Sequence, residues 1–237
     1  MQGYQLSILL VEDNAVTRFL VSQVMEMWGH AVVRTENGRQ AVEAAQEQKF
    51  DVILMDMQMP IMSGVEAVQI IRHGGGPSAA TPIIAFTADA IPENRAGYIA
   101  AGCDTVVTKP IEWDFLAREI KYAVERSKSA PSFIPEAFTA EDSIRLDSKL
   151  EDGFECPILD VRAIAALQDG VGPVLMKELL EQCLVALEFY LTEVKSAADE
   201  ADLINVRRAA HDLKSVCSQF GIMRAGAIAR MIEGGPN

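Results

Sequence analysis

The first half of the chain alternates between short apolar runs and longer amphipathic stretches. The apolar runs are rich in β-branched residues and cover Leu6–Val11, Ala31–Thr35, Asp51–Asp56, Pro82–Thr87 and Thr105–Thr108. Strands have this pattern when helices cover both faces of a parallel sheet. Stretches with helical spacing follow them, at Asn14–Trp28, Gly38–Glu47, Gly64–His73, Pro92–Ala101 and Trp113–Arg126. Five such units in succession predict an α/β fold with a doubly wound, five-stranded parallel sheet.

The composition changes after residue 126. Segment 127–157 carries prolines, small polar residues and seven acids against three bases, which predicts a linker with a short helix near Ala140–Leu146. Only helical patterns follow, at Asp160–Leu167, a long stretch with Pro173 in its first turn, Leu203–Phe220 and Ile222–Glu233. Consecutive helices with short connections predict an all-α bundle. We therefore expect domains at 1–126 and 158–237, joined by an acidic linker.

Charge and hydropathy exclude several classes of function. A net charge of −13 argues against nucleic acid as a partner. No apolar run approaches the roughly 20 residues that cross a bilayer, so we expect no membrane insertion. Four widely spaced cysteines form no CxxC pair, which makes zinc and disulfides weak interpretations. A cytoplasmic protein is the expectation.

Polar side chains stand at the ends of four of the predicted strands. Glu12 and Asp13 follow the first, Asp56 ends the third, Thr87 the fourth, and Lys109 follows the fifth. The carboxyl ends of parallel strands share one edge of the sheet, where α/β proteins bind ligands. Each residue alone has an ordinary structural explanation, since acids often form turns after strands. The five together predict a site for a divalent cation and a phosphoryl group.

The carboxylates suit Mg²⁺, which prefers hard oxygen ligands and keeps several waters. Asp13, Asp56 and the main-chain carbonyl of Gln58 are the candidate ligands, and Glu12 is placed to act through a metal-bound water. Asp56 is also the candidate nucleophile toward phosphorus, forming an acyl phosphate.

Two further side chains would then stabilise the negative charge that develops on the phosphoryl group. Lys109 supplies a cation, and Thr87 supplies a hydroxyl for another phosphoryl oxygen. We expect Lys109 in a solvated crevice, so that its replacement by alanine leaves the fold largely intact.

Residues ~4–126 resemble the receiver domain of two-component response regulators. The matching stretches are ILLVEDN, DVILMDMQMPIMSG, PIIAFTADA and AGCDTVVTKPI. The resemblance implies a flavodoxin-like fold, Asp56 as phosphoacceptor, Mg²⁺ at Glu12 and Asp13, and a cis Lys109–Pro110 bond. Many receivers carry an aromatic residue where this chain has Val106, which favours a phosphoryl way-station over an output switch.

One histidine of the helical half lies in a basic setting. His211 comes one residue after Ala210, which belongs to a seam of core positions spaced 3-4-3-4-3, so the histidine falls on the flank of its helix. The seam positions are Leu203, Val206, Ala210, Leu213, Cys217 and Phe220. The neighbours of His211 one turn away are Arg207, Arg208, Lys214 and Ser215. Cations keep an exposed imidazole unprotonated and attract a phosphoryl group, and a small serine leaves room for a partner. An ordinary surface histidine on a basic patch is the alternative.

The stretch AAHDLKSVCSQFG resembles the signature of histidine phosphotransfer (Hpt) domains, and the resemblance covers residues ~158–233. It implies that His211 is phosphorylated, with Lys214 beside it. Such domains have one more long helix than the pattern here provides. We therefore expect a truncated bundle that pairs with another copy to form a homodimer.

Together the two resemblances indicate a phosphorelay protein, similar to the C-terminal part of hybrid sensor histidine kinases. The implied partners are a sensor histidine kinase and a downstream response-regulator receiver. Because no ATP-binding kinase domain fits in this chain, whether it is itself an enzyme stays open. One alternative is an interaction module controlled by phosphorylation without transfer through His211. A haloacid-dehalogenase-like phosphatase is weaker, because Gln58 stands where that class needs a second aspartate.

Overall fold

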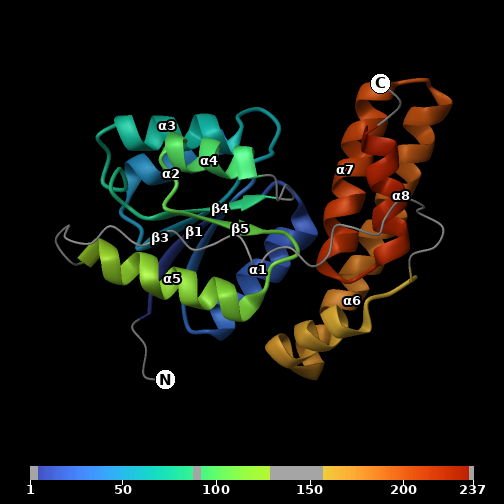
Figure 1. The fold of residues 1–237 in the computed structure, drawn as a ribbon, viewed down its shortest axis with the longest axis horizontal. Coiled ribbons are helices and arrows are strands. Elements are labelled where there is room, and N and C mark those ends of the chain that lie inside the picture. The colour runs from blue at the N-terminus through green and yellow to red at the C-terminus, as the bar shows by residue number, and fades with distance from the viewer. Residues whose placement is uncertain (1–4, 88–91, 129–156, 235–237) are drawn as a thin grey trace.

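A five-stranded parallel sheet forms the centre of the first half of the chain in the computed structural model, which describes residues 5–87, 92–128 and 157–234 (Figure 1). The strands lie in the order β2-β1-β3-β4-β5. Their bounds are β1 Ser7–Val11, β2 Ala31–Thr35, β3 Val52–Asp56, β4 Ile83–Thr87 and β5 Thr105–Thr108. The predicted doubly wound sheet is confirmed, with each strand within a residue of its expected start. Because β1 and β3 are neighbours, the acids after β1 and at the end of β3 meet at one edge.

Helices cover both faces of the sheet. The bounds are α1 Ala15–Met27, α2 Gly38–Glu47, α3 Gly64–His73, α4 Pro92–Ala101 and α5 Trp113–Lys128. In Figure 1, α1 and α5 lie on one face and α2, α3 and α4 on the other. Each face has its own apolar core, and β3 and β4 are fully buried between them. This double burial explains the unbroken apolar runs in the sequence.

The predicted helix starts are confirmed where the cap can be seen. The Asn14 side chain accepts hydrogen bonds from the Val16 and Thr17 amides at the start of α1. Ser63 and Glu66 form a reciprocal capping box at the start of α3. Both caps satisfy amides that a helix leaves unpaired at its first turn. They also fix where the loops after β1 and β3 end, and these loops hold the acidic edge.

The second half of the described chain is helical. Its elements are α6 Val161–Asp199, α7 Leu203–Gln219 and α8 Met223–Gly234. The long α6 is broken at Gly172, where φ is 76° and ψ is 167°, and Pro173 restarts it. Glycine reaches this backbone conformation readily, and proline is suited to the first helical turn. The structure therefore has the predicted short helix and long helix, which meet at Gly172.

Burial along α7 follows the predicted core seam in part. Ala210, Leu213, Cys217 and Phe220 are buried, whereas Leu203 at the start of the helix is 69% exposed. The seam packs on α6 and α8, which both contact α7. The expected acidic linker and the short helix near 140–146 lie outside the described residues. No helix in the described ranges is both long and apolar enough to cross a membrane.

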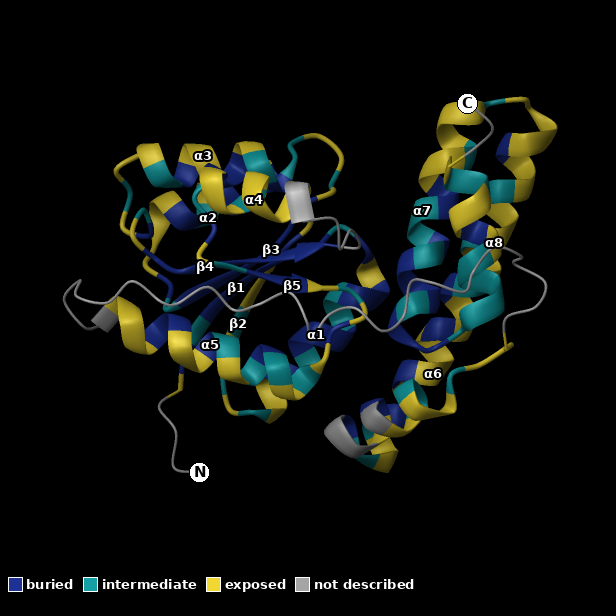
Figure 2. Cartoon of the chain, viewed as in Figure 1, coloured by how far each residue is buried: buried dark blue, intermediate teal, exposed yellow. Residues whose placement is uncertain are grey.

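The two halves of the chain pack on each other through α1. This helix contacts both α6 and α7, and one apolar cluster runs from the sheet through α1 and α5 into the bundle. In Figures 1 and 2 the bundle stands beside the end of the sheet where α1 lies. The carboxyl edge of the sheet therefore lies close to the helical half.

Candidate functional site

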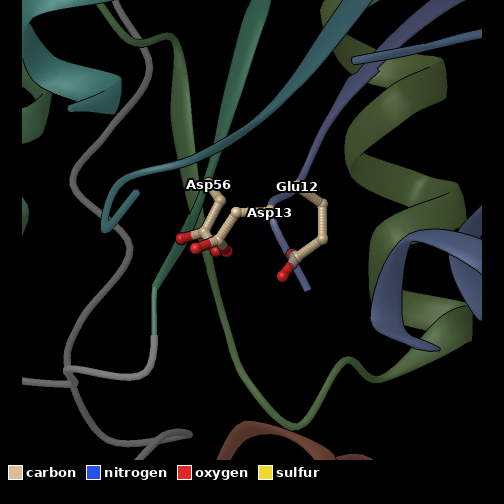
Figure 3. Close-up of side chains that lie close together, drawn as sticks. All are labelled: Glu12, Asp13 and Asp56. Atoms are coloured by element: carbon tan, nitrogen blue, oxygen red, sulfur yellow. The ribbon is translucent and has the colours of Figure 1, made fainter. Parts of the chain in front are cut away.

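Three carboxylates meet at the carboxyl edge of the sheet, as predicted. Glu12 and Asp13 follow β1, Asp56 ends β3, and their candidate ligand oxygens lie within 4.8 Å of one another (Figure 3). Glu12 is fully buried and Asp56 is 3% exposed, whereas Asp13 is half-buried. The adjacent β1 and β3 bring together residues that are more than forty positions apart.

Lys109, directly after β5, forms ion pairs with two of these carboxylates. Its ammonium group lies 2.8 Å from Glu12 Oε2 and 2.7 Å from Asp56 Oδ2. The peptide bond that follows it, Lys109–Pro110, is cis, as the resemblance implied. Burial alone would lower the pKa of this lysine, but the charges of Asp56 and Glu12 raise it above its ordinary value.

The expectation that Lys109 lies in a solvated crevice is wrong. Its side chain is 3% exposed, because the carboxylates at the ends of β1 and β3 draw it inward. Its removal would leave buried carboxylates without their counter-charge, so we expect the lysine to matter for stability too.

Burial and mutual repulsion disfavour the ionised forms of these carboxylates, and a bound cation would reduce that penalty. Burial raises the pKa of Glu12 to about 8, with the charges of Asp56 and Asp13 adding to it and Lys109 opposing. Burial, followed by the charge of Asp56, raises the pKa of Asp13 to about 6. Glu12 Oε1 is buried and has no hydrogen-bond partner among the residues that the structure describes. An unpaired buried oxygen beside two further carboxylates fits the donor set that Mg²⁺ prefers.

Thr87 ends β4, as predicted, and Gln58 follows β3 by two residues. Thr87 is fully buried at the end of β4, and its hydroxyl lies 3.5 Å from the Tyr98 hydroxyl on α4. The Gln58 amide donates to Asp56 Oδ1 at 3.1 Å, which orients that carboxylate. The sequence analysis did not identify Tyr98. No pattern around this residue indicates that its helix places the hydroxyl beside the end of β4.

Gly64 fixes the loop that follows Asp56. A Cβ at this glycine would lie 2.1 Å from the Asp56 carbonyl oxygen and 2.8 Å from the Met57 Cα. The start of α3 therefore packs directly on the end of β3, which only glycine permits. In the sequence, Gly64 is the glycine of the MSG stretch. The close approach that requires a glycine there can be seen only in the structure.

A second constellation surrounds His211 on α7. Its Nδ1 lies 2.6 Å from Glu233 Oε1 on α8, and Lys214 Nζ pairs with the other oxygen of the same carboxylate. Burial would raise the pKa of Glu233, but hydrogen bonds from His211 and Lys214 lower it to about 2. Because the ionised Glu233 carboxylate can only accept, Nδ1 is the donor of this hydrogen bond, and Nε2 is the ring nitrogen that Glu233 leaves available.

The sequence prediction for this histidine is partly wrong. We expected an exposed imidazole among cations, beside a small serine that gives access. The imidazole is instead half-buried against an acid, and Ser215 is 5% exposed. Glu233 lies 22 positions from His211, on the next helix, so the helical spacing around the histidine could not reveal it.

The two constellations lie near the contact between the halves, close enough for their charges to interact. His211 and Asp212 lie near enough to Asp13 to affect its pKa, in opposite directions. Tyr190 on α6 accepts a hydrogen bond from Asn14 Nδ2 at 3.2 Å. Burial, and then the charges of Asp212 and Asp13, raise the pKa of this tyrosine to about 12. The histidine flank of α7 thus lies next to the acidic edge.

Comparison with known protein families separates the chain into two parts. The model of the response regulator receiver domain matches residues 8–121, and that of the Hpt domain matches residues 178–235. The first match includes the acidic edge with Lys109, and the second includes His211 and Glu233.

Curated relatives are sensor kinases that are much longer than this chain. The sensor histidine kinase AruS of Pseudomonas aeruginosa is 31% identical over 223 residues, which are 94% of this chain and 20% of AruS. GacS of Pseudomonas protegens is 26% identical over 95% of this chain and 24% of GacS. The chain therefore spans about a fifth to a quarter of these relatives.

Solved structures match the first half. The receiver domain of the sensor histidine kinase PA1611 of Pseudomonas aeruginosa, solved with a magnesium ion in its active site cleft, is 33% identical. The match covers 52% of this chain and 99% of that domain, with a TM-score of 0.48.

Proposed function

Because this chain belongs to the two-component signalling proteins, with a response regulator receiver domain joined to an Hpt domain, we propose that it carries phosphoryl groups in a phosphorelay. In this proposal Asp56 accepts the group from a phosphohistidine, and His211 passes it to or from a receiver. The observation that carries the proposal is the cluster at the sheet edge, where Lys109 bridges Glu12 and Asp56 at 2.8 Å and 2.7 Å.

Asp56 is the proposed phosphoacceptor of the receiver. Its carboxylate oxygen attacks phosphorus, an O–P bond forms, and the N–P bond of the donor phosphohistidine breaks with its electron pair left on the ring nitrogen. Lys109 already touches Asp56 and stays beside the developing negative charge. The Thr87 hydroxyl, buried at the neighbouring strand end, would donate to another phosphoryl oxygen.

Glu12, Asp13, Asp56 and the Gln58 carbonyl are the proposed residues that hold Mg²⁺. When bound, the ion would reduce the repulsion between the carboxylates and an incoming anionic phosphoryl group. The support is the group of three carboxylates with one unpaired buried oxygen. Without the ion, like charges remain close together and the pKa of Glu12 stays near 8.

His211 is the proposed phosphoacceptor of the Hpt domain. With a proton on Nδ1, the ring offers the Nε2 electron pair to phosphorus, and the ring becomes positively charged as the N–P bond forms. Glu233 lies 2.6 Å from Nδ1 and stabilises that positive charge. Lys214 is positioned by the same carboxylate, close enough to meet a phosphoryl oxygen.

A sensor histidine kinase upstream and a response-regulator receiver downstream are the proposed partners, in the cytoplasm. The sensor histidine kinase AruS carries a region that this chain matches. A longer protein of that kind is therefore one context in which the two domains would work.

Labelling with radioactive acetyl phosphate tests the proposal. The intact chain should gain an alkali-labile acyl phosphate in the presence of Mg²⁺ and not in EDTA. Asp56→Asn should lose the label, whereas the matched control Asp114→Asn, which changes an exposed acid on α5, should keep it. His211→Gln should retain the acyl phosphate but lose the alkali-stable phosphohistidine. Persistent metal-dependent acyl phosphate in Asp56→Asn would refute the assignment.

A dimerisation module is the second candidate, because apolar side chains are exposed along α6. Leu184, Val185 and Phe189 are 62%, 65% and 58% exposed. A second copy of the chain would cover them, and phosphorylation would then control association. Light scattering at several concentrations distinguishes a dimer from a monomer.

A further inference from the structure

An arginine is hydrogen-bonded to the loop that carries the acidic edge, although a positive charge there opposes the binding of a metal cation. Arg18 lies in the first turn of α1, and its side chain turns back toward the loop that joins β1 to α1. Nη1 donates to the main-chain carbonyl oxygens of Glu12 at 2.7 Å and of Asp13 at 3.0 Å. Charge alone would therefore make Arg18 unfavourable for a Mg²⁺ site, so its hydrogen bonds must be considered separately.

The two carbonyl oxygens that Arg18 binds lie on either side of a single Cα atom. The Glu12 carbonyl belongs to the peptide unit before the Asp13 Cα, and the Asp13 carbonyl belongs to the peptide unit after it. Because each peptide unit is planar, holding both carbonyls fixes the two backbone dihedrals of Asp13. These dihedrals set the direction in which the Asp13 Cβ leaves the backbone. The hydrogen bonds of Arg18 thus determine where the Asp13 side chain begins.

Asp13 is the carboxylate of the cluster that most needs such a restraint. Lys109 forms ion pairs with Glu12 and Asp56, and Asp13 lies outside these two pairs. Asp13 is also half-buried, whereas the other two acids are buried. Burial, and then the charge of Asp56, raise the pKa of Asp13, so its ionised carboxylate would move outward into water if the loop allowed it. In Figure 3 the Asp13 carboxylate instead lies beside that of Asp56.

The guanidinium group of Arg18 is itself held in place. Its second nitrogen, Nη2, lies 2.8 Å from Glu36 Oε1, and the arginine side chain is 15% exposed. Glu36 directly follows β2, so this ion pair joins α1 to the end of the strand beside β1. A planar guanidinium can bind two carbonyls and a carboxylate in fixed directions, which the ammonium group of a lysine on its flexible stem cannot reproduce. The pairing with Glu36 also offsets part of the positive charge.

We propose that Arg18 is a positioning residue of the cation site, which keeps the Asp13 carboxylate beside Asp56 and thereby strengthens the binding of Mg²⁺. The inference rests on the proposed function and adds to it a residue that lies outside the carboxylate cluster. The charge of Arg18 and its hydrogen bonds act on metal binding in opposite directions. Because Glu36 offsets the charge, the effect of the hydrogen bonds dominates. The sign of the change on removing Arg18 therefore distinguishes the two effects.

A first experiment measures metal affinity with Mn²⁺, which takes the same oxygen ligands as Mg²⁺ and whose free ion is counted by electron paramagnetic resonance. Arg18→Met should weaken Mn²⁺ binding about 10- to 100-fold, as loss of a group that orients a metal ligand typically does. Arg18→Lys, which keeps the charge and loses the planar group, should fall between Arg18→Met and the wild type. The control Arg34→Met removes an exposed arginine that pairs with Glu26 and should bind as the wild type does.

Two results of this titration would overturn the proposal. Unchanged or tighter binding of Mn²⁺ in Arg18→Met would show that the hydrogen bonds do not support the site. If Arg18→Met does not fold, Arg18→Lys decides, and binding equal to that of the wild type would show that the planar group is not needed.

A double-mutant cycle tests whether Arg18 acts through Asp13. Asp13→Ala removes the carboxylate that Arg18 is proposed to hold, so only the charge of Arg18 remains to act on the ion. Adding Arg18→Met to Asp13→Ala should therefore leave Mn²⁺ binding unchanged or make it tighter, although the same change weakens binding in the wild type. A further loss of the full size in the Asp13→Ala chain would overturn the proposal, because Arg18 would then act through another group.

Backbone order parameters measured by nuclear magnetic resonance in EDTA separate failure of this inference from failure of the proposed function. The amides of Asp13 and Asn14 should fall from about 0.85 toward 0.6 in Arg18→Met and stay unchanged in Arg34→Met. Equal order parameters in all three chains would overturn the positioning, even with Asp56 labelled normally. A fall only in Arg18→Met, with no Mn²⁺ bound by the wild type, would support the hold of Arg18 on the loop and refute the proposed cation site.

Discussion

Replacing Asp13 by asparagine should stabilise the receiver at neutral pH when no divalent cation is present. The fold raises the pKa of Asp13 from 3.8 to about 6, through burial and the nearby charge of Asp56. The folded state therefore disfavours the ionised form. Its stability is full below pH 3.8 and falls as the pH rises to about 6, so the whole penalty is present at pH 7.5. Asparagine keeps the size of the side chain and cannot ionise.

The size of the effect follows from the same two pKa values. The difference between 3.8 and about 6 corresponds to roughly 3 kcal/mol. Asp13 is only half-buried, so water screens part of this interaction, and we expect a gain of about 1–2 kcal/mol. Mg²⁺ should reverse the order, because the wild type keeps the carboxylate that the ion binds.

Urea unfolding followed by tryptophan fluorescence measures this change. Both tryptophans of the chain, Trp28 and Trp113, lie in the receiver, so the signal reports on that domain. Asp13→Asn should unfold at a higher urea concentration than the wild type at pH 7.5 in EDTA, and the gap should close near pH 4. Glu43→Gln, at an exposed position on α2, serves as the control. A variant no more stable than the wild type at pH 7.5 in EDTA would refute the reasoning from burial and charge.

Three further substitutions test other features of the sites. Lys109→Met should lower the free energy of unfolding by roughly 2–4 kcal/mol in the urea assay, because buried carboxylates lose their counter-charge; a neutral effect would show that they protonate without cost. Glu233→Gln should cost about 1–2 kcal/mol at pH 7, since the pKa of Glu233 is lowered to about 2. That contribution is present above about pH 4.5 and is lost as the pH falls toward 2, so thermal unfolding by circular dichroism should show the two chains converging at low pH. Gly64→Ala should impair labelling of Asp56 by acetyl phosphate, because its Cβ would lie 2.1 Å from the Asp56 carbonyl oxygen; normal labelling would show that the loop yields easily.

The sequence predicted the elements well because its apolar runs have a single interpretation. Both faces of β3 and β4 are buried, so the runs are unbroken, and the turns between them end in residues such as Asn14 and Ser63 that cap helices. The meeting of Glu12, Asp13 and Asp56 followed from strand polarity alone.

Features that depend on packing between distant elements could not be predicted in the same way. Glu233 reaches His211 from another helix, and Tyr98 reaches Thr87 from α4. Burial of Lys109 depends on how deeply the carboxylates on two neighbouring strands lie. Spacing along one helix or strand carries no information on such contacts, because they are set by the angle and depth at which separate elements pack.

The position of α1 between the sheet and the bundle affects how such a protein can be recombined. Receivers and phosphotransfer bundles are attractive parts for engineered signalling circuits, and the natural place to cut is the stretch between them. In this chain the cut would part Asn14 from Tyr190 and uncover the part of α1 that contacts α6 and α7. A chimera that takes its receiver from one source and its bundle from another should therefore carry matched sequences on α1 and on the facing sides of α6 and α7. The unit that should be moved as a whole consists of both domains with the contact of α1 with α6 and α7.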